Sequence, residues 1–64
     1  MKQYEAIMIG PVLREIRKGK GLTVEDVADT IGVSVSTLSQ IEQGGRNLSM
    51  RNLYALKDVY ETDA

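Results

Sequence analysis

The sequence predicts an all-α domain built from four or five short helices. Three observations lead to this prediction. Apolar residues recur at helical spacing along almost the whole chain of 64 residues, no run of alternating β-branched residues favours a strand, and residues that commonly cap or stop helices separate the apolar segments. The length fits one small domain, near the lower limit for folding without a disulfide or a metal.

The composition excludes several classes of protein and site. The chain contains no Cys and no His, so it can form neither a disulfide nor a common Cys/His zinc site, and the usual nucleophile–base pairs of enzymes are absent. We therefore expect no enzyme activity, no metal, no cofactor and no small-molecule ligand. The apolar stretches, such as residues 6–9, are too short to span a membrane, and no cleavable signal is visible.

The charge is nearly balanced overall but uneven along the chain. Eight basic and nine acidic residues give a formal net charge of −1, which does not favour nucleic-acid binding. Residues 1–20 carry a net charge of +3, residues 21–45 carry −4, and residues 46–64 are neutral. The simplest interpretation of this pattern is a set of solvent-exposed helix faces.

The first helix is expected to begin at Gly10-Pro11, because Pro is tolerated at the first helical position, and to end near Gly19. Its apolar stripe consists of Val12, Leu13 and Ile16. Residues 1–8 could extend this helix, although Gly10-Pro11 argues for a break. We therefore treat residues 1–8 as an N-terminal extension of uncertain structure and residues 9–64 as the domain.

The two middle helices are short and closely spaced. Thr23 is the expected cap of the first of them, which Gly32 ends because glycine can adopt a left-handed conformation. Ser34 is the expected cap of the second, which runs over about residues 35–43. Two short helices joined by about four residues with a glycine are typical of a helix-turn-helix, here at about residues 24–43. Val33, Leu38 and Ile41 are expected to fix the angle between these helices, and Ala28 is small where they are expected to cross closely.

The last predicted helix runs over about residues 50–60. Gly44-Gly45 ends the preceding helix, and Ser49 is the expected cap of this one. Its apolar stripe consists of Leu53, Leu56, Val59 and Tyr60. Loops of this length are typical of helices that pack as neighbours.

Several motifs of the chain match one known family over about residues 9–60. They are LREIR at 13–17, KGLT at 20–23, VA at 27–28, IGVS at 31–34 and STLSQIE at 36–42. With these motifs the chain resembles the phage-repressor (Cro-like, XRE-type) DNA-binding domains. The resemblance implies a compact lambda-repressor-like fold whose second motif helix, the recognition helix, lies in the major groove of double-stranded DNA.

The resemblance also implies roles for individual residues. The residues implied for contacts with base edges are Val35, Ser36, Ser39 and Gln40. Gln40 is the strongest of these, because a Gln side chain can form two hydrogen bonds with adenine. The residues implied for phosphate contacts are Thr23, Ser34, Thr37, Arg46 and Asn47. The alternative is a plain solvent-facing helix residue at each base-contact position, and a simple turn at Arg46 and Asn47.

One pair of charged residues is implied to be structural. In the family, an Arg near the end of the first helix commonly pairs with the Glu that ends the recognition helix. Arg17 and Glu42 occupy the matching positions. We therefore expect a structural ion pair that orients the recognition helix.

The chain departs from the family at positions that bear on specificity. Val24 stands where Gln is common, Val35 replaces a position that is often polar, and the predicted recognition helix carries no cation. These differences favour contacts with A·T pairs or recognition of DNA shape. The family's fifth helix should begin about where residues 61–64 end the chain, so we expect either a domain cut from a longer regulator or cover by residues 1–8.

Two functions of different classes remain open. The first is a sequence-specific transcriptional regulator, a repressor of bacterial, phage or mobile-element type. It would act on double-stranded DNA as a homodimer, formed for instance through a missing C-terminal part, in the cytoplasm at the nucleoid. The second is a helical protein-interaction module of antitoxin or anti-repressor type that uses the acidic segment 21–45. Salt dependence separates them, because phosphate binding weakens steeply as salt rises.

Overall fold

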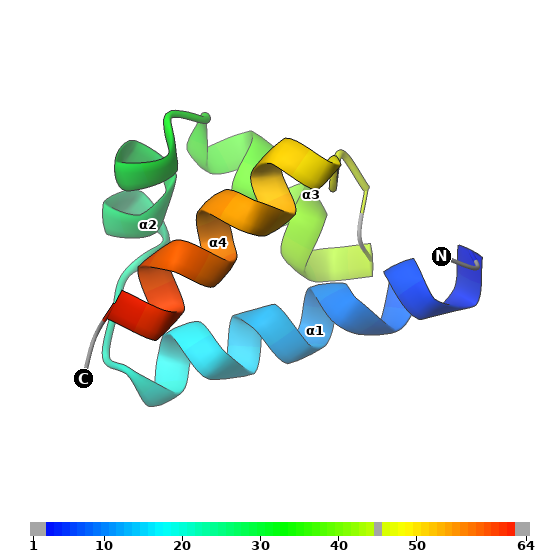
Figure 1. Ribbon diagram of the computed structural model, residues 1–64, viewed down its shortest axis with the longest axis horizontal. Coiled ribbons are helices and arrows are strands. Elements are labelled where there is room, and N and C mark those ends of the chain that lie inside the picture. The colour runs from blue at the N-terminus through cyan, green and yellow to red at the C-terminus, as the bar shows by residue number, and fades with distance from the viewer. Residues whose placement is uncertain (1–2, 45, 63–64) are drawn as a thin grey trace.

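Four helices make up the part of the chain that the structure describes. The computed structural model describes the backbone of residues 3–44 and 46–62 and the side chains of residues 9–44 and 46–61. The helices are α1 (Gln3–Gly19), α2 (Val24–Ile31), α3 (Val35–Gly44) and α4 (Met50–Thr62). The described backbone contains no strand, so the predicted all-α class is confirmed. In Figure 1, α1 runs along the lower edge, α4 lies above it, α2 lies at the left, and α3 lies at the top, partly behind α4.

The core lies where the helices meet. The side chains of Leu38, Ile41 and Leu56 are fully buried, and those of Val27 and Ala28 are 1% exposed. The chain buries these residues because α1 packs against α3, while α2 packs against both α3 and α4. Burial of one large aliphatic side chain contributes about 1.5–3 kcal/mol, so this small cluster is the main source of stability.

The predicted start of the first helix at Gly10-Pro11 is wrong. The backbone is helical from Gln3 to Gly19, and Pro11 lies inside α1. The side chain of Pro11 is exposed, so its ring lies on the solvent side, and the missing N–H removes one intrahelical hydrogen bond without ending the helix. The backbone of residues 3–8 therefore extends α1. The expectation that residues 1–8 cover the core lies outside the described residues, because the structure describes neither residues 1–2 nor the side chains of residues 1–8.

The buried side of α1 also differs from the predicted stripe. Leu13 is buried as predicted, but Val12 is 55% exposed and Ile16 is 39% exposed. The side of α1 that faces the core instead follows Ile9, Leu13 and Arg17, which are spaced four residues apart. An arginine therefore takes an inward position that an apolar pattern cannot indicate.

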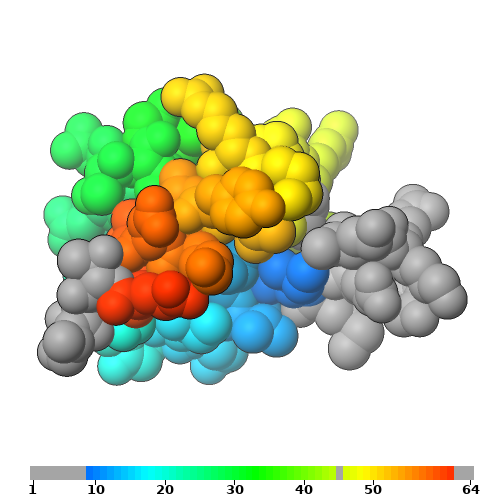
Figure 2. All heavy atoms as spheres, viewed as in Figure 1, coloured from blue at the N-terminus to red at the C-terminus, as the bar shows by residue number. Residues whose placement is uncertain are grey.

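Figure 2 shows the face on which α4 lies beside α1. A shallow pocket of about 340 Å³ lies on this face. It is lined by Leu13, Ile16, Leu53, Tyr54, Lys57, Tyr60 and Glu61. None of the described helices has both the length and the apolar character that crossing a membrane requires.

The predicted caps of α2, α3 and α4 are confirmed. The hydroxyl oxygen of Thr23 accepts a hydrogen bond from the backbone N–H of Asp26, at 3.0 Å. Ser34 caps α3 through the N–H of Thr37 at 3.0 Å, and Ser49 caps α4 in the same way at 3.1 Å. Each hydroxyl satisfies one backbone donor that the helix start leaves unpaired. The predicted stop of α3 at Gly44-Gly45 involves Gly45, which lies outside the described residues.

Candidate nucleic-acid interface

The turn between α2 and α3 has the geometry that a helix-turn-helix needs. Gly32 adopts the left-handed conformation, with φ of +79°. The N–H groups of Gly32 and Val33 donate to the carbonyl of Ala28 at 2.9 and 3.0 Å, which satisfies the end of α2 within a sharp turn. Ala28 is 1% exposed, so its small side chain allows α3 to cross close to α2. The sequence therefore sets both the turn and the crossing.

The first turn of α3 is held by a compact hydroxyl network. Besides accepting from the N–H of Thr37, the Ser34 hydroxyl donates to the hydroxyl oxygen of Thr37 at 2.9 Å. The Thr37 hydroxyl proton thus remains free to donate outward. Val35 (41% exposed) and Ser36 lie exposed at this end of the helix, and Ser39, one turn further on, is half-buried.

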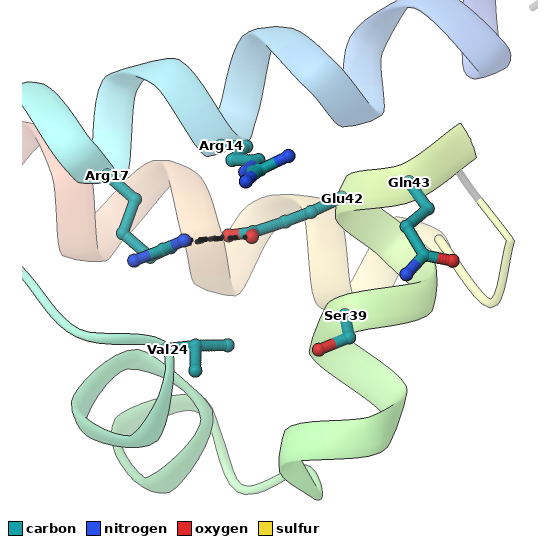
Figure 3. A pocket seen from close by; sticks show the side chains of 6 residues that line it. All are labelled: Arg14, Arg17, Val24, Ser39, Glu42 and Gln43. Atoms are coloured by element: carbon teal, nitrogen blue, oxygen red, sulfur yellow. Dashed lines mark hydrogen bonds and ion pairs between the residues drawn. The ribbon is translucent and has the colours of Figure 1, made fainter.

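Ser39 lies in a shallow pocket of about 200 Å³ that α1, α2 and α3 form together. Figure 3 shows its lining residues, which are Arg14, Arg17, Val24, Ser39, Glu42 and Gln43. Val24 is half-buried and supplies an apolar wall here. The valine packs against the core cluster, and it has no polar group for a phosphate.

Arg14 and Gln43 belong to this surface although the sequence reasoning did not select them. Both side chains are exposed and line the same pocket as Ser39. The sequence spacing could have indicated Gln43. It lies three residues after Gln40 and four residues after Ser39, so it shares their side of α3. Nothing in the local pattern indicates that Arg14 on α1 reaches the same place.

Arg17 and Glu42 form a two-bond ion pair behind this surface. The Nε of Arg17 donates to Oε2 of Glu42 at 2.7 Å, and Nη2 donates to Oε1 at 3.2 Å. A further hydrogen bond joins Nη1 to the backbone carbonyl of Leu22 at 2.8 Å. The two side chains are 12% and 5% exposed, and the hydrogen bonds to Glu42 raise the pKa of Arg17 above its usual value. The pair ties α1, the following loop and α3 together.

The loop after α3 brings three of the predicted residues together. Arg46 and Asn47 are exposed, and Asn47 has a left-handed backbone with φ of +67°. The Nδ2 group of Asn47 donates to Oε1 of Gln40 on α3. An open hollow of about 290 Å³ beside this contact is lined by Gln40, Gln43, Gly44 and Arg46. Thr23 lies apart from this cluster, at the start of α2.

Comparison with known proteins identifies the family. The model of the helix-turn-helix family matches residues 13–64, which include all of α2, α3 and α4. This chain belongs to the helix-turn-helix family. The phage-repressor (XRE-type) resemblance of the sequence is thereby confirmed.

Two curated relatives of this helix-turn-helix protein are named as regulators. The HTH-type transcriptional regulator DdrOP3 of Deinococcus deserti is 40% identical over 48 residues, which cover 75% of this chain and 37% of that protein. The uncharacterized HTH-type transcriptional regulator YazB of Bacillus subtilis is 40% identical over 60 residues, which cover 94% of this chain and 87% of that protein. The match thus spans little more than a third of the first relative. No solved structure matches the chain significantly.

Proposed function

We propose that this protein is a DNA-binding transcriptional regulator that places α3 in the major groove of double-stranded DNA. The observation that carries the proposal is the charge of α3. Its one carboxylate, Glu42, is buried and paired with Arg17, so the solvent side of the helix presents no negative charge to a phosphate backbone. Family membership and the names of both relatives support the same function.

The proposed contacts divide between bases and phosphates. Side chains on the exposed part of α3 meet base edges, and Gln40 is the main specificity residue because its amide carries both a donor and an acceptor. The residues proposed for base contacts are Val35, Ser36, Ser39 and Gln40. The hydroxyls and polar groups at helix starts and in the following loop meet phosphates. The residues proposed for phosphate contacts are Thr23, Ser34, Thr37, Arg46 and Asn47.

The proposed working form is a homodimer that represses transcription in the cytoplasm, at the nucleoid. Helix-turn-helix proteins commonly bind two half-sites one DNA turn apart, which requires two symmetric copies. A single domain of this size also buries little DNA surface, and tight specific binding needs more. We propose a binding protein rather than an enzyme.

Selection of bound duplexes from a random pool tests this function. The wild-type chain should enrich one sequence, arranged as a palindrome if the protein binds as a dimer. The Gln40→Ala variant should relax the base preference at one position of each half-site. The Arg46→Gln variant should instead weaken binding to all sequences about equally, because a phosphate contact carries no sequence information. Failure of the wild-type chain to enrich any duplex contradicts the proposal.

One observation favours a second candidate, a protein-interaction module. Glu25, Asp26 and Asp29 are all exposed, so the solvent side of α2 is strongly acidic. Such a surface suits a basic protein partner better than DNA. The same selection separates the two functions, because an antitoxin or anti-repressor of this kind enriches no duplex sequence.

A further inference from the structure

The loop between α3 and α4 holds Asn47 in a fixed position. The carbonyl of Asn47 accepts two hydrogen bonds, from the backbone N–H of Ser49 at 3.1 Å and from Nδ2 of Asn52 at 3.0 Å. Both donors belong to the capped start of α4, where Ser49 also accepts from the N–H of Asn52. Among the described residues, Asn47 is the one non-glycine residue with a positive φ, a conformation that asparagine tolerates well. The start of α4 therefore anchors Asn47.

From this anchored position Asn47 reaches back to the recognition helix. Its Nδ2 group donates to Oε1 of Gln40, seven residues earlier in the chain. The contact uses one lone pair of the Gln40 oxygen and leaves the other lone pair and both Nε2 protons available. The side-chain amide of Gln40 is thereby given a direction.

We propose that Asn47 is a positioning residue that orients the amide of Gln40 for base recognition. This inference rests on the proposed DNA-binding function. A free Gln amide can turn over and exchange its oxygen and nitrogen. Here turning the Gln40 amide alone would set its Nε2 donor against the Nδ2 donor of Asn47, which is unfavourable because neither group can accept, so the two amides can only turn together.

A fixed amide direction has a consequence for sequence preference. Adenine offers a donor at N6 and an acceptor at N7, so it needs one acceptor and one donor in a defined order. In its contact with Asn47, Gln40 presents them in one order. A freely turning amide can instead place its Nε2 donor where the oxygen lay and donate to the O6 acceptor of guanine, which weakens the discrimination. Asn47 therefore acts on the choice of base through Gln40, in addition to the phosphate contact proposed for it above.

The Asn47→Gly variant removes the donor and keeps the backbone. Glycine adopts a positive φ without strain, and the two hydrogen bonds to the carbonyl of residue 47 remain possible. We expect the preference for the favoured base at the Gln40 position to fall about threefold to tenfold, the range that one hydrogen bond accounts for. Preferences at the other positions should not change. The Asn47→Asp variant, which tolerates the same backbone but only accepts, should also lose the preference.

A double-mutant cycle separates this role from a phosphate contact. In the Gln40→Ala background, Asn47→Gly should have no further effect on base preference, because the residue acts through Gln40. In the free protein, the side-chain amide of Gln40 should become more mobile by NMR relaxation in the Asn47→Gly variant, while circular dichroism shows an unchanged helix content.

The outcomes have separate meanings. A wild-type chain that enriches one duplex, together with an Asn47→Gly variant of unchanged base preference, overturns this inference and leaves the proposed function standing. Equal weakening on all sequences with no change in base preference, also in the Gln40→Ala background, leaves Asn47 with the phosphate contact alone and overturns the inference as well. A wild-type chain that binds no duplex overturns the proposed function, and the inference falls with it.

Discussion

At the scale of single residues, Tyr60 on α4 carries a buried group without a partner. Its side chain is 7% exposed, and within the described part of the chain its hydroxyl makes no hydrogen bond. An unsatisfied buried hydroxyl destabilises a protein by roughly 1 kcal/mol or more. We therefore expect Tyr60→Phe to raise the melting temperature, by about 4–8 °C per kcal/mol in a domain of this size. Tyr54 is 58% exposed, so Tyr54→Phe is the matched control and should change little.

Tyr60 also makes stability depend on alkaline pH. Burial raises the pKa of Tyr60 from 10.0 to about 12, and the nearby negative charge of Glu42 acts in the same direction. In the unfolded chain the phenol loses its proton near pH 10, whereas in the folded chain it keeps the proton until about pH 12. The free energy of unfolding should therefore fall between these two values. Urea unfolding at several pH values should show this additional fall in the wild type and not in Tyr60→Phe.

The pair of Arg17 and Glu42 should matter most when one partner is removed. Glu42→Ala leaves a guanidinium that is 12% exposed with its carbonyl contact to Leu22 but without a counter-charge. Breaking a buried pair in this way destabilises by about 3 kcal/mol. Urea unfolding measures this loss of stability. Glu15 on α1 is exposed and provides the control, because Glu15→Ala should stay within about 0.5 kcal/mol of the wild type. A Glu42→Ala variant as stable as Glu15→Ala would contradict a structural role.

At the scale of helices, replacing two glycines that have equal space around them by alanine should change the stability in opposite directions. An added Cβ meets no atom within 4 Å at either Gly19 or Gly32. Gly19 is the last residue of α1, so Gly19→Ala should stabilise the helix by up to about 1 kcal/mol. Gly32 has φ of +79°, where a Cβ is strained, so Gly32→Ala should destabilise by about 1–2 kcal/mol. Thermal unfolding of both variants checks the signs, and equal shifts would show that conformation does not decide the effect.

The helices also show what the sequence can and cannot predict. Caps and stops are local, so Thr23, Ser34, Ser49 and Gly32 were predicted at the right positions. The start of α1 was predicted wrongly because proline is typical of a first helical turn, and that preference is judged from neighbouring residues alone. In the structure the helix runs on through Pro11, whose ring is exposed to solvent.

The candidate surface required contacts between distant parts of the chain. Arg14 joins the pocket of Ser39 because α1 packs against α3, and no local pattern contains that packing. The contact of Asn47 with Gln40 depends on a left-handed backbone in the loop, which an asparagine permits but does not require.

At the scale of the whole molecule, the position of each charge matters more than the net charge of −1. Glu42 is neutralised by Arg17, and the exposed acids Glu25, Asp26 and Asp29 lie on α2. Besides Arg17, which is paired with Glu42, two further arginines line the hollows beside α3, namely Arg14 and Arg46. A negative total is therefore compatible with a local positive field at the recognition helix, although the acidic helix beside it should limit affinity.

This arrangement predicts a moderate salt dependence. If each protomer of a dimer neutralises two phosphates through Arg14 and Arg46, the slope of log K against log salt should be about −3.6, and affinity should fall roughly 150-fold between 50 and 200 mM salt. Arg46→Gln should reduce the slope by about two, one for each protomer. Lys57→Gln removes the same charge from α4, beside the apolar pocket, and should leave the slope unchanged. Fluorescence anisotropy on the selected duplex measures all three slopes. Equal slopes for the two variants would show that net charge, and not the cations beside α3, governs the approach to DNA.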